Sequence, residues 1–175
     1  MKIAFIGTHG TGKTTLAYDV AGVLKKKGYD VEVVTSIARS SPFPINENST
    51  EKSQLWISLS MINKELEIQK TCEHIVCARS ILDAYAYTLN ILNNSQFFKN
   101  LFEYWIKTYD ILIYTPIRYK LEKDFVRSDN KEFQIKIDNI IKKILNENNI
   151  KFSELPEQDS INFVVKLFED KLKKE

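Results

Sequence analysis

One stretch near the amino terminus, GTHGTGKTT at residues 7–15, constrains this chain more than any other. It holds three of the chain's five glycines, and it matches the pattern G-x-x-x-x-G-K-[ST] at every fixed position. The apolar run at 3–6 predicts a buried strand before it, and a helix is expected to begin at about Lys13. The stretch is therefore expected to be a turn from strand to helix, where glycines let backbone N–H groups converge on an anion.

These residue types at this spacing predict a site for a nucleoside triphosphate, expected to be ATP, although the motif does not specify the base. The amides would hold the phosphates at the positive end of the helix dipole. The Lys13 ammonium is expected to bridge the β- and γ-phosphates, and the Thr14 hydroxyl to bind Mg²⁺. The expected binding residues are Gly7, Thr8, His9, Gly10, Thr11, Gly12, Lys13, Thr14 and Thr15.

His9 occupies one of the variable positions of this pattern. We expect it to be an exposed loop residue without a role, with contact to the terminal phosphate as the alternative. The sequence alone does not decide between the two.

Composition limits the classes of protein that remain. The 175 residues suggest one domain, and 43% hydrophobic with 27% charged residues is ordinary for a globular protein. A net charge of +2 argues for neither nucleic acid nor a membrane surface as partner. Cys72 and Cys77 have no further cysteine or histidine cluster beside them, which predicts reduced, half-buried thiols. No apolar run is long enough for a signal peptide or a spanning helix, so a cytoplasmic location is expected.

Strand-like and helix-like segments alternate along the chain, which predicts an α/β fold with a parallel sheet covered on both faces. Strands are expected at 3–6, 31–34, 74–78, 110–115 and 150–154. Helices are expected from about Lys13, from about Glu51, and at 81–92, 96–108, 132–148 and 158–174.

In two of the expected helices the side chains predict which faces are buried. In the helix near Glu51, which Asn48 is expected to cap, a leucine and isoleucine series predicts a single buried face: Leu55, Leu59, Ile62 and Leu66. The helix at 96–108 carries aromatic residues on most sides. Packing in the core is expected there, and a ligand or partner surface is the alternative.

The chain resembles the P-loop nucleotide and nucleoside kinases. Within that group it is similar to small single-domain AAA-type ATPases and kinases related to the ribosylnicotinamide kinase domain of the bifunctional NAD-biosynthesis regulator. The resemblance covers about residues 1–165, and GTHGTGKTTLA is its specific part. Weaker support comes, in the expected order, from IARSSPFPINENSTEKSQLWI at 37–57, CARSILDAYAY at 77–87 and FVRSDNKEFQIKIDNII at 125–141.

This resemblance implies a P-loop NTPase fold, a three-layer α/β/α sandwich with a five-stranded parallel sheet in the order 2-3-1-4-5. Residues 1–175 would form a single domain with a lid-like segment at about 117–131. The implied chemistry is transfer of the γ-phosphate from Mg-ATP to a small acceptor such as a nucleoside or nucleotide. Arg127 fits the family's lid arginine, which neutralises charge in the transition state.

Two positions depart from the pattern of these kinases. Ala78 stands before Arg79 where an aspartate is usual, and Ser36 stands at the end of the second strand where a glutamate is usual. Both acids would face the γ-phosphate, and loss of a catalytic base typically costs about 10²- to 10⁴-fold in rate. A kinase therefore stays open beside an alternative, an ATP-binding module with slow ATPase activity that regulates a partner.

Three further charged residues are candidates for the site. Asp83 is expected either to arrange the acceptor or bind Mg²⁺ through water, or only to stabilise the start of its helix. Arg39 and Arg79 follow strands at the end nearest the glycine-rich turn, where they could clamp an anionic acceptor or the γ-phosphate, or form structural ion pairs. A homodimer remains open, and a nucleic-acid substrate is not favoured because a strongly basic surface is lacking.

Overall fold

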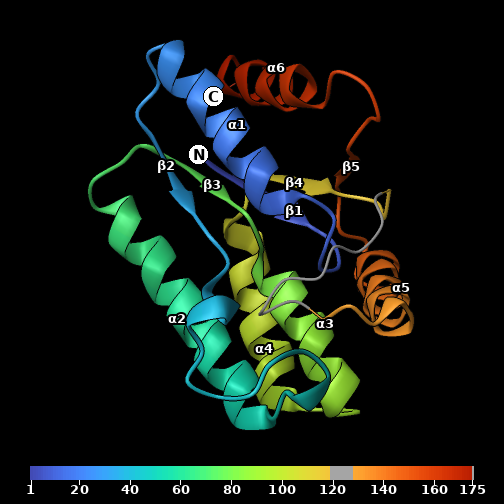
Figure 1. Cartoon of the computed structure of the whole chain (residues 1–175). Helices are drawn as coiled ribbons and strands as arrows, with labels where there is room; N and C mark the ends of the chain where they lie inside the picture. Colours follow the sequence, from blue (N-terminus) through green and yellow to red (C-terminus); the bar gives the residue numbers. More distant parts are fainter. Residues whose placement is uncertain (119–127, 175) are drawn as a thin grey trace.

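A parallel five-stranded sheet forms the centre of the computed structural model, which describes residues 1–118 and 128–174 (Figure 1). Its strand order β2-β3-β1-β4-β5 is the one expected from the sequence. The strands are β1 (Lys2–Ile6), β2 (Val31–Val34), β3 (His74–Cys77), β4 (Ile111–Tyr114) and β5 (Ser153–Glu154). The helices are α1 (Lys13–Lys26), α2 (Glu51–Gln69), α3 (Ile81–Ile91), α4 (Gln96–Trp105), α5 (Lys131–Glu147) and α6 (Ser160–Leu172).

Helices cover both faces of the sheet, which gives the three layers of an α/β/α sandwich. Helices α1 and α6 lie on one face, and α2, α3, α4 and α5 lie on the other (Figure 1). Because successive side chains of a strand point to opposite faces, β1 serves both layers. Ile3 and Phe5 pack towards α1 and α6, whereas Ala4 and Ile6 pack towards α2 to α5.

The strand register brings three loops together at the carboxyl end of the sheet. Ile6, the last residue of β1, pairs with Tyr114 of β4, and Ala4 pairs with Cys77 of β3. Gly7, Ala78 and Thr115 therefore follow neighbouring strands at the same edge. In open α/β sheets this edge is where ligands bind.

Helix α2 differs from its prediction in which face is buried. Leu55, Leu59 and Leu66 were expected to be buried, but they are exposed. The buried residues of this helix are Ser53, Gln54, Ile57, Ser58, Met61 and Glu65. The prediction was wrong because it took apolar side chains as the marker of the inner face, although polar side chains are buried wherever hydrogen bonds satisfy them.

The buried carboxylate of Glu65 accounts for much of this arrangement. Its oxygens accept hydrogen bonds from Lys2 Nζ at 2.8 Å, Trp105 Nε1 at 2.8 Å and the Tyr109 hydroxyl at 2.7 Å. The carboxylate thus joins α2 to β1 and to the end of α4. A leucine at this position could not satisfy these three donors.

The start of α2 also differs from the sequence prediction. Thr50 caps the helix in place of the expected Asn48, and it shares a capping box with Ser53. Asn48 instead ends a short 3-10 turn, Asn46–Asn48. The real cap lies two residues later because the Thr50 hydroxyl reaches the Ser53 amide at 3.2 Å.

The aromatic helix α4 is buried on one face and exposed on the other. Phe98, Phe102 and Trp105 are buried, as expected for core packing, and Phe102 stacks on Tyr85 with ring centroids 4.7 Å apart. Phe97 and Tyr104 are exposed. In the described part of the chain, no helix combines the length and the apolar character needed to cross a membrane.

Candidate active site

The turn from β1 into α1 borders a cavity of about 680 Å³ that is open to solvent. Residues 9–15 line one side of it, and residues after β2 and β3 line the other. The lining residues are His9, Gly10, Thr11, Gly12, Lys13, Thr14, Thr15, Ser36, Ala38, Arg39, Ile45, Asn46, Ala78 and Arg79. The structure thus brings together most of the residues that the sequence singled out for phosphate binding.

Glycine is required at several points of this turn, which we call the phosphate loop (residues 7–15). Gly7, Gly10 and Gly12 have φ angles of 140°, 75° and 82°, which other residues rarely adopt. A Cβ atom on Gly7 would lie 2.7 Å from both the carbonyl oxygen and the Oγ1 of Thr115. The close approach of β4 therefore leaves no room for a side chain at this position.

The Lys13 side chain is buried at the wall of the cavity. Its Nζ donates to the Thr8 carbonyl oxygen and to Thr11 Oγ1, the latter at 3.0 Å. Thr14, the second residue of α1, is partly buried and lines the same cavity. An ammonium group, a hydroxyl group and the amino end of a helix are thus combined in one site, which suits a polyphosphate.

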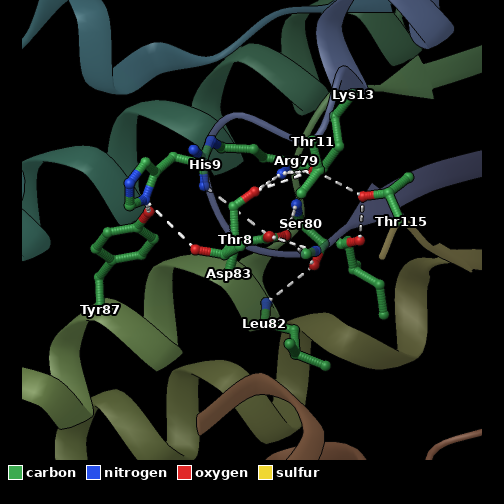
Figure 2. Close-up of polar contacts among 12 residues, drawn as sticks. Thr8, His9, Thr11, Lys13, Arg79, Ser80, Leu82, Asp83, Tyr87 and Thr115 are labelled. Carbon is green, nitrogen blue, oxygen red and sulfur yellow. Dashed lines mark hydrogen bonds and ion pairs between the residues drawn. The ribbon is translucent and has the colours of Figure 1, made fainter. Parts of the chain in front are cut away.

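Two threonines join the phosphate loop to the sheet: Thr11 in the loop and Thr115 directly after β4. Thr115 Oγ1 donates to the Ile6 carbonyl at 2.8 Å and is hydrogen-bonded to Thr11 Oγ1 at 3.0 Å (Figure 2). The Thr11 hydroxyl has one proton, which it donates either to Thr115 Oγ1 or to the Thr8 carbonyl, at 3.1 Å. These bonds fix the loop's conformation through side chains that the motif itself does not specify.

Asp83 supports the same loop from helix α3. Its carboxylate is buried; Oδ1 accepts from the Gly7 amide at 3.0 Å, and Oδ2 accepts from the amide and hydroxyl of Ser80 at 2.8 and 3.1 Å (Figure 2). Arg79 Nη1 lies 4.0 Å from Oδ1. Asp83 therefore caps α3 and holds the first glycine of the loop, and it is not among the residues that line the cavity.

His9 was expected to be exposed, but only 3% of its surface is accessible. The expectation was wrong because α3 and α5 both pack against this part of the loop. His9 Nδ1 lies 3.0 Å from the Tyr87 hydroxyl, its ring centroid lies 5.6 Å from that of Phe133, and its carbonyl accepts from Gln134 Nε2 at 2.8 Å. Burial raises the pKa of Tyr87, although the neighbouring Arg79 partly offsets this, so the hydroxyl keeps a proton to donate.

Two arginines reach the cavity from the strand ends. Arg79 lies 5.5 Å from the centre of the Tyr87 ring, and this contact and the nearby Asp83 carboxylate orient its guanidinium group. Arg39 is exposed in the short turn Ile37–Ser40 after β2. Both therefore lie where a phosphate or an anionic acceptor could be clamped.

No acidic side chain is among the described residues that line the cavity. Ala78 and Ser36 do line it, at the two positions where related kinases usually carry acids. In the described ranges there is also no group of three His, Cys, Asp or Glu side chains that could hold a metal ion. Among the described residues, protein ligation of Mg²⁺ would thus rest on the Thr14 hydroxyl, with phosphate oxygens and water as further ligands.

A second cavity, of about 500 Å³ including space open to solvent, adjoins the first and shares Ala38, Ile45, Asn46 and Arg79 with it. Ile57 and Met61 of α2 and Tyr87 of α3 form much of its apolar wall. Gln54 also lines it; this side chain is buried and donates from Nε2 to Ser49 Oγ at 3.1 Å. A small molecule with an apolar ring and a few polar groups would fit such a lining.

The sequence did not identify Gln54 or Tyr87, which both line the second cavity. A signal for Gln54 was present, because it is a polar residue one position before the leucine series of α2. Tyr87 gave no such signal, since an aromatic residue in an apolar helix usually belongs to the core.

The expected lid is described only at its two ends. Arg127 lies outside the described residues, which omit 119–127. At one end, Arg118 donates to the carbonyl oxygens of Pro156, at 2.8 Å, and Leu155, which anchors it to the segment after β5. At the other end, the Ser128 hydroxyl donates to the Glu47 carboxylate.

A sequence model of the AAA domain family matches residues 2–161 of the chain. No curated protein matches the sequence. Among solved structures, the chain is similar to deoxyadenosine kinase from M. mycoides with bound dATP, at 23% identity and a TM-score of 0.60 over 99% of both chains.

Two further solved structures are similar over nearly their whole length. One is the same deoxyadenosine kinase with the products dCMP and a flexible dCDP bound, at 22% identity and a TM-score of 0.57 over 99% of both chains. The other is thymidylate kinase from Ehrlichia chaffeensis, at 21% identity and a TM-score of 0.64 over 98% of both chains. These similarities confirm the predicted P-loop fold with its 2-3-1-4-5 sheet.

Proposed function

The chain belongs to this AAA domain family, and we propose that it is a kinase that transfers the γ-phosphate of Mg-ATP to a small acceptor, namely a nucleoside, a nucleotide or a related molecule. One observation carries the proposal: the cavity at the phosphate loop and the more apolar cavity beside it share Arg79, Ala38, Ile45 and Asn46. A nucleotide and an acceptor bound in the two cavities would meet at Arg79. A protein that only hydrolysed ATP would have no need of the second cavity.

In this proposal the phosphate loop binds the triphosphate through its amides and the Lys13 ammonium. The Thr14 hydroxyl is the protein ligand for Mg²⁺, which would neutralise charge on the phosphoryl group being transferred. An oxygen of the acceptor, a hydroxyl in a nucleoside or a phosphate oxygen in a nucleotide, attacks the γ-phosphorus; a new O–P bond forms, the bond to the β-phosphate oxygen breaks, and ADP leaves. The proton of the hydroxyl passes to a phosphate oxygen or to water, since the described lining offers no carboxylate.

The arginines supply positive charge around the transferring group. Arg79 acts at the boundary of the two cavities, with Arg39 on the open side. Arg127, in the undescribed segment, would act from the lid. Asp83 is proposed to act indirectly, as a positioning residue that holds the Gly7 amide and faces Arg79. Phosphoryl transfer depends chiefly on such positioning and charge neutralisation.

The acceptor class rests on the second cavity and on the neighbours. The structurally similar deoxyadenosine kinase is described with dATP bound, and with dCMP and dCDP bound. The buried Gln54 amide, among Ile57, Met61 and Tyr87, offers hydrogen bonds to a planar polar ring. These features together favour a nucleoside or nucleotide as acceptor.

A second candidate function is an ATP-binding module with slow ATPase activity that regulates a partner. The observation that favours it is the absence of a carboxylate among the described lining residues, with Ala78 and Ser36 at the positions usually acidic. The predicted difference is kinetic. A kinase would be accelerated by its acceptor, whereas a module would hydrolyse ATP at a slow rate that no small acceptor changes.

An ADP-release assay with Mg-ATP distinguishes the two. Nucleosides, nucleotides and nicotinamide riboside are added one at a time, and we expect one class to raise the rate of ADP release well above the rate without acceptor. With that acceptor, Gln54→Leu should raise its KM about tenfold or more, with little change in the KM for ATP. Gln69→Leu, exposed on the same helix, is the matched control. Slow release that no acceptor stimulates would reject the kinase in favour of the module.

A further inference from the structure

His9 belongs to the phosphate loop, but its side chain also contacts helices α3 and α5. It lines the cavity at the loop, although only 3% of its surface is accessible. Its Nδ1 lies 3.0 Å from the hydroxyl of Tyr87, and Figure 2 shows this hydroxyl beside the imidazole ring. Because Tyr87 lines the second cavity, this one hydrogen bond joins a wall of the first cavity to a wall of the second.

The backbone of His9 is held by the loop itself and by helix α5. Gly10, the next residue, has a φ angle of 75°, and the His9 carbonyl accepts from Gln134 Nε2 at 2.8 Å. Gln134 is buried, so water competes little for this bond. The imidazole ring of His9 therefore has a defined position relative to the loop amides and to Lys13.

The ring of Tyr87 is held on more than one side. Phe133 meets it edge-on with the ring centroids 5.9 Å apart, and the guanidinium carbon of Arg79 lies 5.5 Å from the centre of the ring. The hydroxyl is the end of the side chain that reaches the phosphate loop. The bond to His9 thus fixes how far the Tyr87 ring, and the Arg79 guanidinium beside it, lie from the loop.

This spacing matters for a phosphoryl transfer between the two cavities. The loop would hold the γ-phosphate, and an acceptor in the second cavity would contact the wall that Tyr87 and Arg79 form. Reacting atoms have to lie about 3–3.5 Å apart and in line, and a misplacement of about 1 Å can cost about 100-fold in rate. A side chain that joins the loop to this wall is therefore placed to set the distance over which transfer occurs.

We propose that His9 is a positioning residue for the acceptor, because its hydrogen bond to Tyr87 sets the wall of the second cavity at a fixed distance from the phosphate loop. The proposal rests on the proposed kinase activity. It differs from a role of His9 as a phosphate ligand in what it predicts. Loss of the imidazole should affect turnover with the acceptor far more than binding of Mg-ATP, since the loop amides and Lys13 hold the phosphates.

Steady-state kinetics test the proposal, with the compound that stimulates the wild type most among nucleosides, nucleotides and nicotinamide riboside. His9→Leu should lower kcat at least tenfold, while the dissociation constant for Mg-ATP, from calorimetry, changes less than about threefold. His9→Asn should recover most of kcat, since its amide offers an oxygen or an N–H near the position of Nδ1. The matched control is His74→Leu, at a buried histidine that begins β3, the end of that strand away from Ala78, and its kcat should stay within about twofold of the wild type.

Tyr87→Phe tests whether His9 acts through the tyrosine. This variant keeps the ring, and it should lower kcat by about the same factor as His9→Leu. The double variant should lose no more, because both substitutions remove the same hydrogen bond. If circular dichroism shows that His9→Leu does not fold, Tyr87→Phe supplies the test by itself.

Three results in folded variants would each overturn the proposal. They are an unchanged kcat in His9→Leu or Tyr87→Phe, equal losses of kcat and of Mg-ATP affinity, and effects that multiply in the double variant. A wild-type protein that no acceptor stimulates would reject the kinase and this inference with it. That failure is distinguishable, because it appears before any variant is compared.

Discussion

The phosphate loop and helix α2 border the same site, but the backbone determines the structure of the loop, whereas side chains determine how the helix is placed. The loop is defined by its backbone: three glycines with positive φ angles, a bond from the Gly7 amide to Asp83, and a close approach to Thr115. Helix α2 is defined by its side chains, since any helix-forming sequence could supply its backbone. Which of its faces is buried depends on what lies around it.

That difference explains why α2 was predicted with the wrong face inward. The buried side of α2 carries Gln54, Ser58 and Glu65, because it faces the second cavity at one end and a polar network at the other. The leucines lie outside that side. An apolar pattern shows which side chains avoid water, but it does not show whether their own core or a second molecule covers them.

The largest expected effect concerns the polar side of α2. Glu65→Ala should lower the free energy of unfolding by about 3–5 kcal/mol, because the variant leaves the buried Lys2 ammonium, 2.8 Å from Glu65 Oε2, without its counter-charge. Glu67→Ala, which removes an exposed partner of Lys64, should cost less than about 1 kcal/mol. Urea unfolding measures both. Equal losses in the two variants would mean that the Glu65 network does not decide the buried face.

The next effect concerns the backbone of the phosphate loop. Gly7→Ala should lower the free energy of unfolding by about 3 kcal/mol, through a strained φ of 140° and contacts of 2.7 Å with Thr115. Gly22→Ala, in the middle of α1 with open space around its Cβ position, should instead raise stability by about 0.5–1 kcal/mol. Thermal or urea unfolding should give changes in stability of opposite sign for the two variants. A neutral Gly7→Ala would show that the loop can relax around a side chain.

Asp83 links the loop to helix α3, and its effect should appear mainly in binding. Asp83→Asn keeps the shape of the side chain but loses the charge and one acceptor, so an N–H of the amide would face the Ser80 donors. We expect the dissociation constant for Mg-ATP to rise about tenfold, with a loss of about 1–2 kcal/mol in stability. Asp19→Asn, exposed on α1, is the control. Unchanged affinity in a folded Asp83→Asn protein would remove Asp83 from the list of positioning residues.

The smallest effect concerns pH. Burial and the hydrogen bond to Asp138 raise the pKa of Tyr114 to about 12, against 10.0 for the unperturbed side chain. Between these values the unfolded chain releases a proton that the folded protein keeps, so this tyrosine's contribution to stability is lost as the pH rises from 10 towards 12. Partial solvent screening reduces the effect to about 1 kcal/mol. Urea unfolding should show that the free energy of unfolding decreases less between pH 9.5 and pH 11 for Tyr114→Phe than for the wild type. Equal decreases in the two proteins would contradict the raised pKa.

Much of the framework could be read from the sequence because it depends on local patterns. The buried run at 3–6, the glycines of the loop and the strand at 31–34 are all specified by neighbouring residues. The sheet order followed from the resemblance to P-loop kinases, and the structure confirms it. The features of the candidate site that the sequence did not predict depend on distant contacts. His9 is buried by α3 and α5, Gln54 acquires its surroundings from the 45–49 loop, and Asp83 meets Gly7 across 76 residues of chain.

The central claim is that the phosphate loop binds the polyphosphate of Mg-ATP with Lys13 as its principal charged group, and titration calorimetry measures this directly. The account predicts saturable binding of Mg-ATP to the wild-type protein and a loss of affinity of at least 100-fold in Lys13→Ala. Lys25→Ala, at an exposed lysine of α1 paired with Glu32, should bind like the wild type. No heat and no thermal protection with millimolar Mg-ATP or Mg-GTP, or equal binding by Lys13→Ala, would contradict it.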